Sequence, residues 1–157
     1  MKASKYIGLT LFILVIVIVG FAISERITPI GMVDKTSLNQ GLFSEVVING
    51  YDPVSYHTDH KAVAGVEEIH SEWKGGKWLF STLENKTLFD ASPVKYAPLF
   101  GGYCVYAITQ GFTANTNPEI FEVVNGNLVL FAAEDVRNEW MKDPVGNIEA
   151  CTQYWNE

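Results

Sequence analysis

The chain has 157 residues, with 11 basic and 18 acidic side chains and a formal net charge of −7. This length predicts one domain, or one domain plus an anchoring segment. The acidic balance, without any Lys/Arg run, excludes the electrostatic footprint of a nucleic-acid-binding protein. Two cysteines are too few for a scaffold held together by disulfides.

The N-terminus carries an uncharged apolar run over residues 6–23, preceded by Lys2 and Lys5. About 18 such residues are the minimum for a spanning helix, whereas a cleavable signal peptide has an apolar core of about 7–15 residues. Residues 22–24 offer a weak cleavage site, and a buried core helix is the plain alternative. We predict an uncleaved signal anchor, a transmembrane helix over 1–24, with the rest of the chain on the extracytoplasmic (periplasmic or extracellular) side of the membrane.

Residues 25–43 contain a proline and two glycines and predict a tether, followed by a domain over 44–157. In that domain, residues 46–48 predict a strand that ends at the turn signal Asn49-Gly50. A second strand is predicted over 77–80. Ser81 and Glu84 then fit a capping box that opens a helix reaching about residue 90.

The second half of the chain predicts a short turn over 93–96 and helices over 102–109, 133–142 and 148–154. Its clearest element is a hairpin of residues 120–124 and 127–132, because Asn125-Gly126 favours the type I′ turn between paired strands. We find no internal repeat in the sequence. Short strands mixed with short helices predict an α+β domain with a small antiparallel sheet and several short helices. The tryptophans predict an aromatic core or a lined small-molecule pocket.

Several short segments match, in order, a known family. They are Gly50-Tyr51-Asp52-Pro53-Val54, Trp78 with Phe80-Ser81, Phe89, Pro93-Val94-Lys95-Tyr96-Ala97-Pro98, Gly101-Gly102-Tyr103-Cys104, and Asn125-Gly126 with Leu128. Together they resemble the YHS domain-containing (seleno)protein family over about residues 50–155. The resemblance implies a YHS-like domain that binds a metal ion, copper or zinc, or a small ligand without catalysis.

The chain departs from the metal-binding pattern of related YHS domains, in which two cysteines flank a strand-to-helix turn as Phe-Cys-Ser-x-x-Cys. Here Ser81 and Asn85 occupy those two positions, so the inherited metal site is absent there. The remaining candidate ligands are Cys104, His57 and His60. A His-x-x-His pair binds copper or zinc when a third ligand converges on it. The plain alternatives are solvated histidines on an exposed loop and a buried packing cysteine.

The sequence therefore predicts a membrane-anchored YHS-type domain that binds copper, zinc or a small ligand, with a second membrane protein as a further predicted partner. One alternative is a thiol redox protein that uses Cys104, alone or in a disulfide with Cys151, which an exported protein would permit. Another is a ligand-free accessory domain of a membrane complex. No residue set supports an enzyme, and no catalytic residue is predicted. Asn85-Lys86-Thr87 matches a glycosylation sequon inside the predicted helix.

Overall fold

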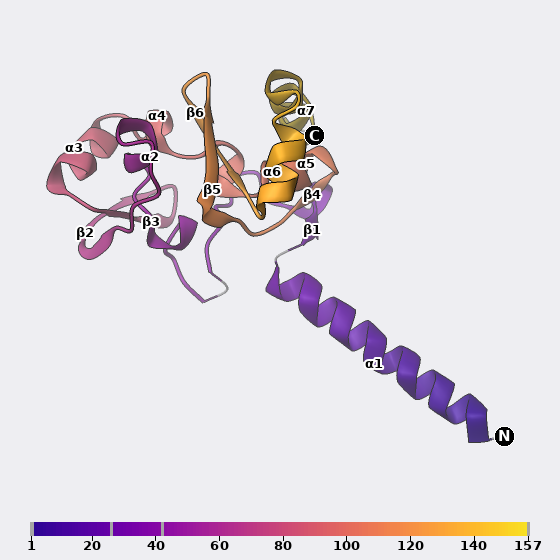
Figure 1. Ribbon diagram of the computed structural model, residues 1–157. Coiled ribbons are helices and arrows are strands. Elements are labelled where there is room, and N and C mark those ends of the chain that lie inside the picture. Colours follow the sequence, from indigo (N-terminus) through magenta and orange to yellow (C-terminus); the bar gives the residue numbers. More distant parts are fainter. Residues whose placement is uncertain (1, 26, 42, 157) are drawn as a thin grey trace.

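The N-terminal helix projects away from the rest of the molecule (Figure 1). This structure is a computed structural model that describes residues 2–25, 27–41 and 43–156, with side chains from residue 10 onward. The helix α1 spans Lys2–Ser24. Asn115 fixes its end, because the Asn115 backbone N–H donates to the Glu25 carbonyl at 2.9 Å and its side-chain amide to the Ser24 carbonyl at 3.0 Å.

The predicted membrane anchor is not supported. In the part of the chain that the structure describes, no helix is both long enough and apolar enough to cross a membrane. The transmembrane helix over 1–24, and the extracytoplasmic placement that depended on it, are therefore corrected. Nor is the segment 25–43 a free tether, since Ile30 and Leu38 are both buried in the body of the protein.

The body is α+β, as the sequence predicts, but it holds three two-stranded antiparallel sheets rather than one small sheet. The pairs are β1 (Thr28–Pro29) with β4 (Phe112–Thr113), β2 (Val66–Trp73) with β3 (Gly76–Phe80), and β5 (Asn117–Val124) with β6 (Asn127–Phe131). Among the described residues, isolated parallel bridges add Val46 to β3 at Lys77 and Cys104 to β6 at Leu130.

Short helices surround the two longer hairpins. Figure 1 shows α2, α3 and α4 gathered around the β2–β3 hairpin, and α5, α6 and α7 around the β5–β6 hairpin. Their bounds are α2 Ser55–Thr58, α3 Leu83–Ala91, α4 Pro93–Tyr96, α5 Val105–Thr109, α6 Glu134–Trp140 and α7 Pro144–Asn156, with 3₁₀ turns at Ile30–Met32, Ile48–Gly50 and Leu99–Gly102.

The two halves of the body repeat one another. Each runs in the order 3₁₀ turn, short helix, hairpin, helix, helix, and only β4 has no counterpart. We call residues 48–96 the first repeat and residues 99–156 the second repeat. The hairpins have equivalent bulges and registers, and each pairing in the second lies 51 positions after its counterpart: Val66–Phe80 and His70–Leu79 in the first, Asn117–Phe131 and Phe121–Leu130 in the second.

The turns of the two repeats also match. The hairpins close through Lys74-Gly75 and Asn125-Gly126, and all four residues have φ between 51° and 78°. Positive φ at both central positions defines the type I′ turn. Each repeat begins with three consecutive left-handed residues, at 48–50 and at 100–102. The sequence analysis missed the repeat because identical pairs at a spacing of 51 are scattered singly or in twos: Gly50/Gly101, Val54/Val105, Thr58/Thr109, Glu68/Glu119, Ile69/Ile120, Gly75/Gly126, Leu79/Leu130, Phe80/Phe131, Pro93/Pro144 and Val94/Val145.

Strand β6 connects the two hydrophobic cores. Side chains alternate between the two faces of a strand. Leu128 and Leu130 accordingly lie in a first core with side chains of the first repeat, such as Trp78 and Phe89. Val129 and Phe131 lie in a second core with side chains of the second repeat and Ile30. The repeats are therefore not independent domains, because one strand contributes to both cores.

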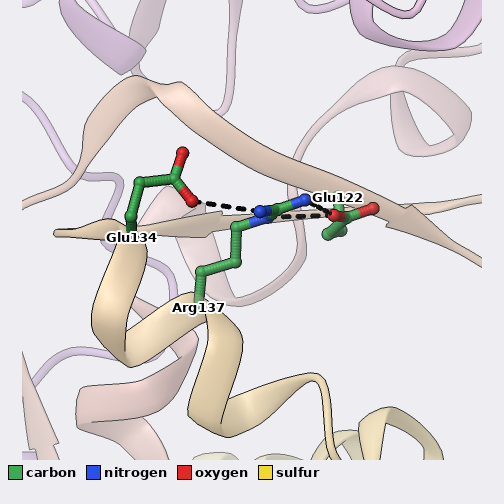
Figure 2. Close-up of polar contacts among 3 residues, drawn as sticks. All are labelled: Glu122, Glu134 and Arg137. Atoms are coloured by element: carbon green, nitrogen blue, oxygen red, sulfur yellow. Dashed lines mark hydrogen bonds and ion pairs between the residues drawn. The ribbon is translucent and has the colours of Figure 1, made fainter.

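An arginine clamps α6 onto its hairpin (Figure 2). Arg137 Nε donates to Glu122 Oε1 of β5 at 2.9 Å, Nη2 contacts the same oxygen, and Nη1 donates to Glu134 Oε2 at 3.0 Å. In the first repeat the equivalent position is Lys86. Its ammonium pairs with Asp90 at 2.5 Å, and Asp90 accepts from Ser71 of β2. In the second repeat the cation itself links the helix to the hairpin, whereas in the first repeat the link is made by the Asp90 carboxylate, which Lys86 pairs with inside α3.

Candidate functional site

The structure does not assemble the predicted metal site. Cys104 is buried just before α5, His57 lies in α2, and His60 is exposed. Across the described residues, no group of three or more His, Cys, Asp or Glu side chains is placed to hold a metal ion. The prediction of copper or zinc bound by Cys104, His57 and His60 is therefore corrected, and with it the metal-binding interpretation of the chain.

The repeat explains the place of Cys104, which is the counterpart of Asp52. Each follows a left-handed turn and a tyrosine, and each is buried. The backbone N–H of Asp52 donates to the Val63 carbonyl at 2.8 Å, and that of Cys104 donates to the equivalent Ala114 carbonyl at 3.1 Å. The thiol thus occupies the position that a carboxylate occupies in the first repeat.

The carboxylate of Asp52 is a buried acceptor for four hydrogen bonds. Its Oδ1 accepts from the Val54 backbone N–H at 2.9 Å. Its Oδ2 accepts from the Ser81 N–H at 2.8 Å, the Ser81 hydroxyl at 2.7 Å and the Asn85 side-chain amide at 2.7 Å. Ser81 and Asn85 therefore hold a carboxylate in place.

Two smaller predictions change as a result. The residue that caps α3 is Thr82, whose hydroxyl accepts from the Asn85 backbone N–H at 3.1 Å, so the predicted cap at Ser81 is one residue early. Asn85 is only 9% exposed and its side-chain amide is bonded to Asp52. The glycosylation sequon is therefore not accessible in the folded protein.

Both thiols are buried and free. Burial raises the pKa of Cys104, although the backbone amides of Ala107, Ala132 and Tyr106 oppose the shift. Burial also raises the pKa of Cys151 to about 12. The indole N–H of Trp140, which has no other hydrogen-bond partner, acts in the opposite direction and lowers this pKa. Cys151 donates to the Val105 carbonyl at 3.3 Å. Since the thiolate is the reactive form, this arrangement does not favour the redox alternative.

We expect both thiols to be unreactive in the native state. Dithionitrobenzoate should modify them at least about 100-fold more slowly in the native protein than in concentrated guanidinium chloride, because exposure and ionisation both require opening of the core. The single variants Cys104→Ser and Cys151→Ser assign each rate to its thiol. Rapid stoichiometric modification of native Cys104 would contradict the prediction and revive the redox alternative.

His57 is half-buried, and its Nε2 atom has no hydrogen-bond partner. The imidazole meets the Tyr96 ring edge to face, with centroids 5.4 Å apart. Burial lowers the pKa of His57, and the nearby charges of Lys95 and His60 lower it further, while the Tyr96 backbone carbonyl opposes the shift. The histidine is therefore neutral at pH 7 and packs as an aromatic ring.

Acidification should weaken the fold through His57. Below about pH 6.5, the ordinary histidine pKa, the unfolded chain takes up this proton before the folded protein does, so stability falls with pH. We expect His57→Phe to reduce that loss by less than about 1 kcal/mol, since the ring is only half-buried. Urea unfolding between about pH 5 and 7.5 measures this loss of stability. His70→Phe is the control, because His70 is an exposed histidine. Equal pH dependence in the two variants would argue against this role for His57.

The most promising hollow of the surface lies where the two repeats meet, and we call it the junction pocket. Its volume is about 200 Å³. Its walls come from the N-terminal segment, from the β2–β3 turn, from the passage between the repeats and from the end of α7: Lys35, Thr36, Ser37, Leu38, Trp73, Lys74, Val94, Ala97, Pro98, Leu99, Phe100, Gly101 and Trp155.

Two lysines lie over two tryptophans in this pocket. Lys74 Nζ is 4.7 Å from the centroid of the Trp73 ring. Lys35 Nζ is 5.6 Å from that of Trp155 and also donates to the Tyr154 carbonyl at 3.2 Å. Both are cation–π distances. Each indole also packs against a phenylalanine ring, Trp73 against Phe89 with centroids 5.9 Å apart and Trp155 against Phe100 at 5.7 Å, so the aromatic walls are held in place.

A close approach of two backbones forms one side of the pocket. Gly101 has φ of 66°, and a Cβ atom there would lie 2.3 Å from the Ser37 carbonyl oxygen. The Asn39 backbone N–H donates to the Gly101 carbonyl at 2.8 Å. The glycine therefore lets the N-terminal segment lie directly against the link between the repeats.

A larger hollow of about 400 Å³ beside β5 is a weaker candidate. Its carboxylates already have partners within the protein. Glu122 and Glu134 pair with Arg137, and Glu119 accepts from the Tyr51 hydroxyl at 3.2 Å. His60 lines the same hollow without completing a ligand set.

Comparison with family models, with curated proteins and with solved structures finds no match to this chain. The resemblance to the YHS family therefore stays a prediction, and the functional argument depends on the geometry of the junction pocket.

Proposed function

We propose that this protein is a non-catalytic binding module whose junction pocket takes a small organic ligand with a flat apolar body. The observation that carries the proposal is a pocket between the repeats that is walled by Trp73 and Trp155. Ligand sites form preferentially at such boundaries and are lined mainly by apolar and aromatic groups. Their polar groups are few, and here they include Lys35 and Lys74.

The size of the pocket limits the ligand. About 200 Å³ is below the range of about 300–1,000 Å³ that is usual for drug-sized molecules. A compound with a single ring fits that space. For about nine non-hydrogen atoms at roughly 0.3–0.6 kcal/mol each, we expect a Kd between about 100 μM and 10 mM.

The lining favours binding over catalysis. Its hydroxyl groups belong to Thr36 and Ser37. The Ser37 hydroxyl lies 3.3 Å from the Tyr103 hydroxyl, and the Thr36 hydroxyl donates to the carboxylate of Asp34 at 2.8 Å. Nucleophilic catalysis needs an effective base beside the nucleophile, whereas the hydrogen bonds from Thr36 lower the pKa of Asp34 and make it a weaker base.

A pair of equivalent substitutions tests the proposal. Val94 lines the pocket, and Val145 occupies the same position in the second repeat without lining it. We expect benzoate and benzamide to give saturation-transfer NMR signals with the native protein and with Val145→Trp. Val94→Trp should weaken binding at least about tenfold, because the indole fills the pocket. No binding of either probe at about 10 mM, or undiminished binding to Val94→Trp, would overturn the proposal.

A further inference from the structure

We infer that the junction pocket selects organic anions, with Lys35 and Lys74 attracting the carboxylate of the ligand and the apolar residues of the lining taking its apolar body. This inference rests on the proposed function, since it names the class of ligand for the same pocket.

The first argument is the local sign of charge. The chain carries a net charge of −7, yet the residues that line the pocket include two lysines and no aspartate or glutamate. On an acidic protein a cationic pocket is the exception, and clefts lined by one sign of charge raise the local concentration of the opposite ion. The net charge repels anions at long range, so recognition has to come from the pocket itself.

The second argument is that the two ammonium groups are not neutralised. Every ion pair of the described residues uses another cation: Lys77, Lys86, Arg137 or Lys142. Lys35 donates instead to the uncharged Tyr154 carbonyl. An ammonium group has three N–H donors, so donors remain on Lys35 and Lys74 for a ligand.

The third argument is positional. Each ammonium group lies over an indole ring, which holds it at the pocket. The lining also includes the apolar residues Leu38, Ala97 and Leu99. Lysine acts as a point charge, whereas arginine offers a fork that matches phosphate and carboxylate bidentately. The arrangement therefore favours a single carboxylate on an apolar body over a large polyphosphate.

The test compares benzoate with benzamide, which have nearly the same shape and differ in charge at neutral pH. At low ionic strength we expect the native protein to bind benzoate at least about fivefold more tightly than benzamide. The ratio of the benzoate affinity to the benzamide affinity should fall as sodium chloride is added. Lys35→Gln and Lys74→Gln should each lower it, and the double variant should bring it close to one. Lys142→Gln is the matched control, because Lys142 is an exposed lysine on the far repeat, paired with Glu139.

The outcomes separate the two proposals. If both probes bind equally to the native protein and Val94→Trp removes both, the pocket is a binding site and anion selection is overturned. If benzoate is preferred but the double lysine variant keeps the preference, the assignment to Lys35 and Lys74 is overturned. If neither probe binds, the proposed function fails, and the selection fails with it.

Discussion

Replacing Asp52 with alanine is expected to lower the free energy of unfolding by about 3–5 kcal/mol. The carboxylate is fully buried and accepts hydrogen bonds from the Val54 and Ser81 backbones and from the side chains of Ser81 and Asn85. Its removal leaves buried donors without acceptors, and each unsatisfied group costs about 1–3 kcal/mol. Urea unfolding at neutral pH measures the change.

Asp59→Ala is the matched control for Asp52→Ala. Asp59 is an exposed aspartate in the same part of the first repeat, and its loss should change stability by less than about 0.5 kcal/mol. The loss of stability in Asp52→Asn should lie between those of Asp52→Ala and Asp59→Ala. The amide keeps one acceptor oxygen, but its NH₂ group faces the donors that the carboxylate accepted from. A loss below about 1 kcal/mol for Asp52→Ala would show that the cluster is not an anchor of the fold.

Gly101→Ala is expected to destabilise the protein by about 3–5 kcal/mol and to weaken ligand binding in the junction pocket. Two effects add: the left-handed backbone at φ of 66°, and a new methyl group only 2.3 Å from the Ser37 carbonyl oxygen. Left-handed backbone alone costs a residue with a Cβ atom about 1–2 kcal/mol. The contact with Ser37 is to backbone, which cannot move aside without opening the pocket.

Gly75→Ala separates these two effects. Gly75 has a similar φ of 73°, but a Cβ atom there meets nothing within 4 Å. The control should therefore lose only about 1–2 kcal/mol, and the difference between the two variants reports the contact with Ser37. Thermal unfolding of both variants gives the comparison, and equal losses would mean that the close approach does not matter.

Local structure was predictable wherever a few neighbouring residues determine it. Asn125-Gly126 predicted the β5–β6 hairpin and its turn, and Pro93 predicted the start of α4. The predicted helix over 102–109 begins only at Val105, because residues 100–102 are left-handed. The left-handed backbone of Phe100 could not be predicted from the sequence, because a phenylalanine at positive φ is rare and is held there by contacts with distant parts of the chain.

The site was harder to predict, because its parts are distant in the sequence. Lys35 and Trp155 meet only through the packing of the C-terminal helix, and no spacing rule connects them. Cys104 attracted attention because thiols are rare in the chain, yet its position in the fold is that of Asp52. That equivalence would have been visible from the sequence through the Gly-Tyr pair that precedes both residues, Gly50-Tyr51 before Asp52 and Gly102-Tyr103 before Cys104.

The sharing of β6 between the two cores has a consequence for synthesis of the protein. A nascent chain that has completed the first repeat still lacks Leu128 and Leu130, which belong to its core. Domains generally fold as units during translation, and here the first unit cannot close until β6 has left the ribosome. A chain that terminates before Leu128 therefore presents unburied aromatic surface to chaperones and proteases, however complete its first repeat is.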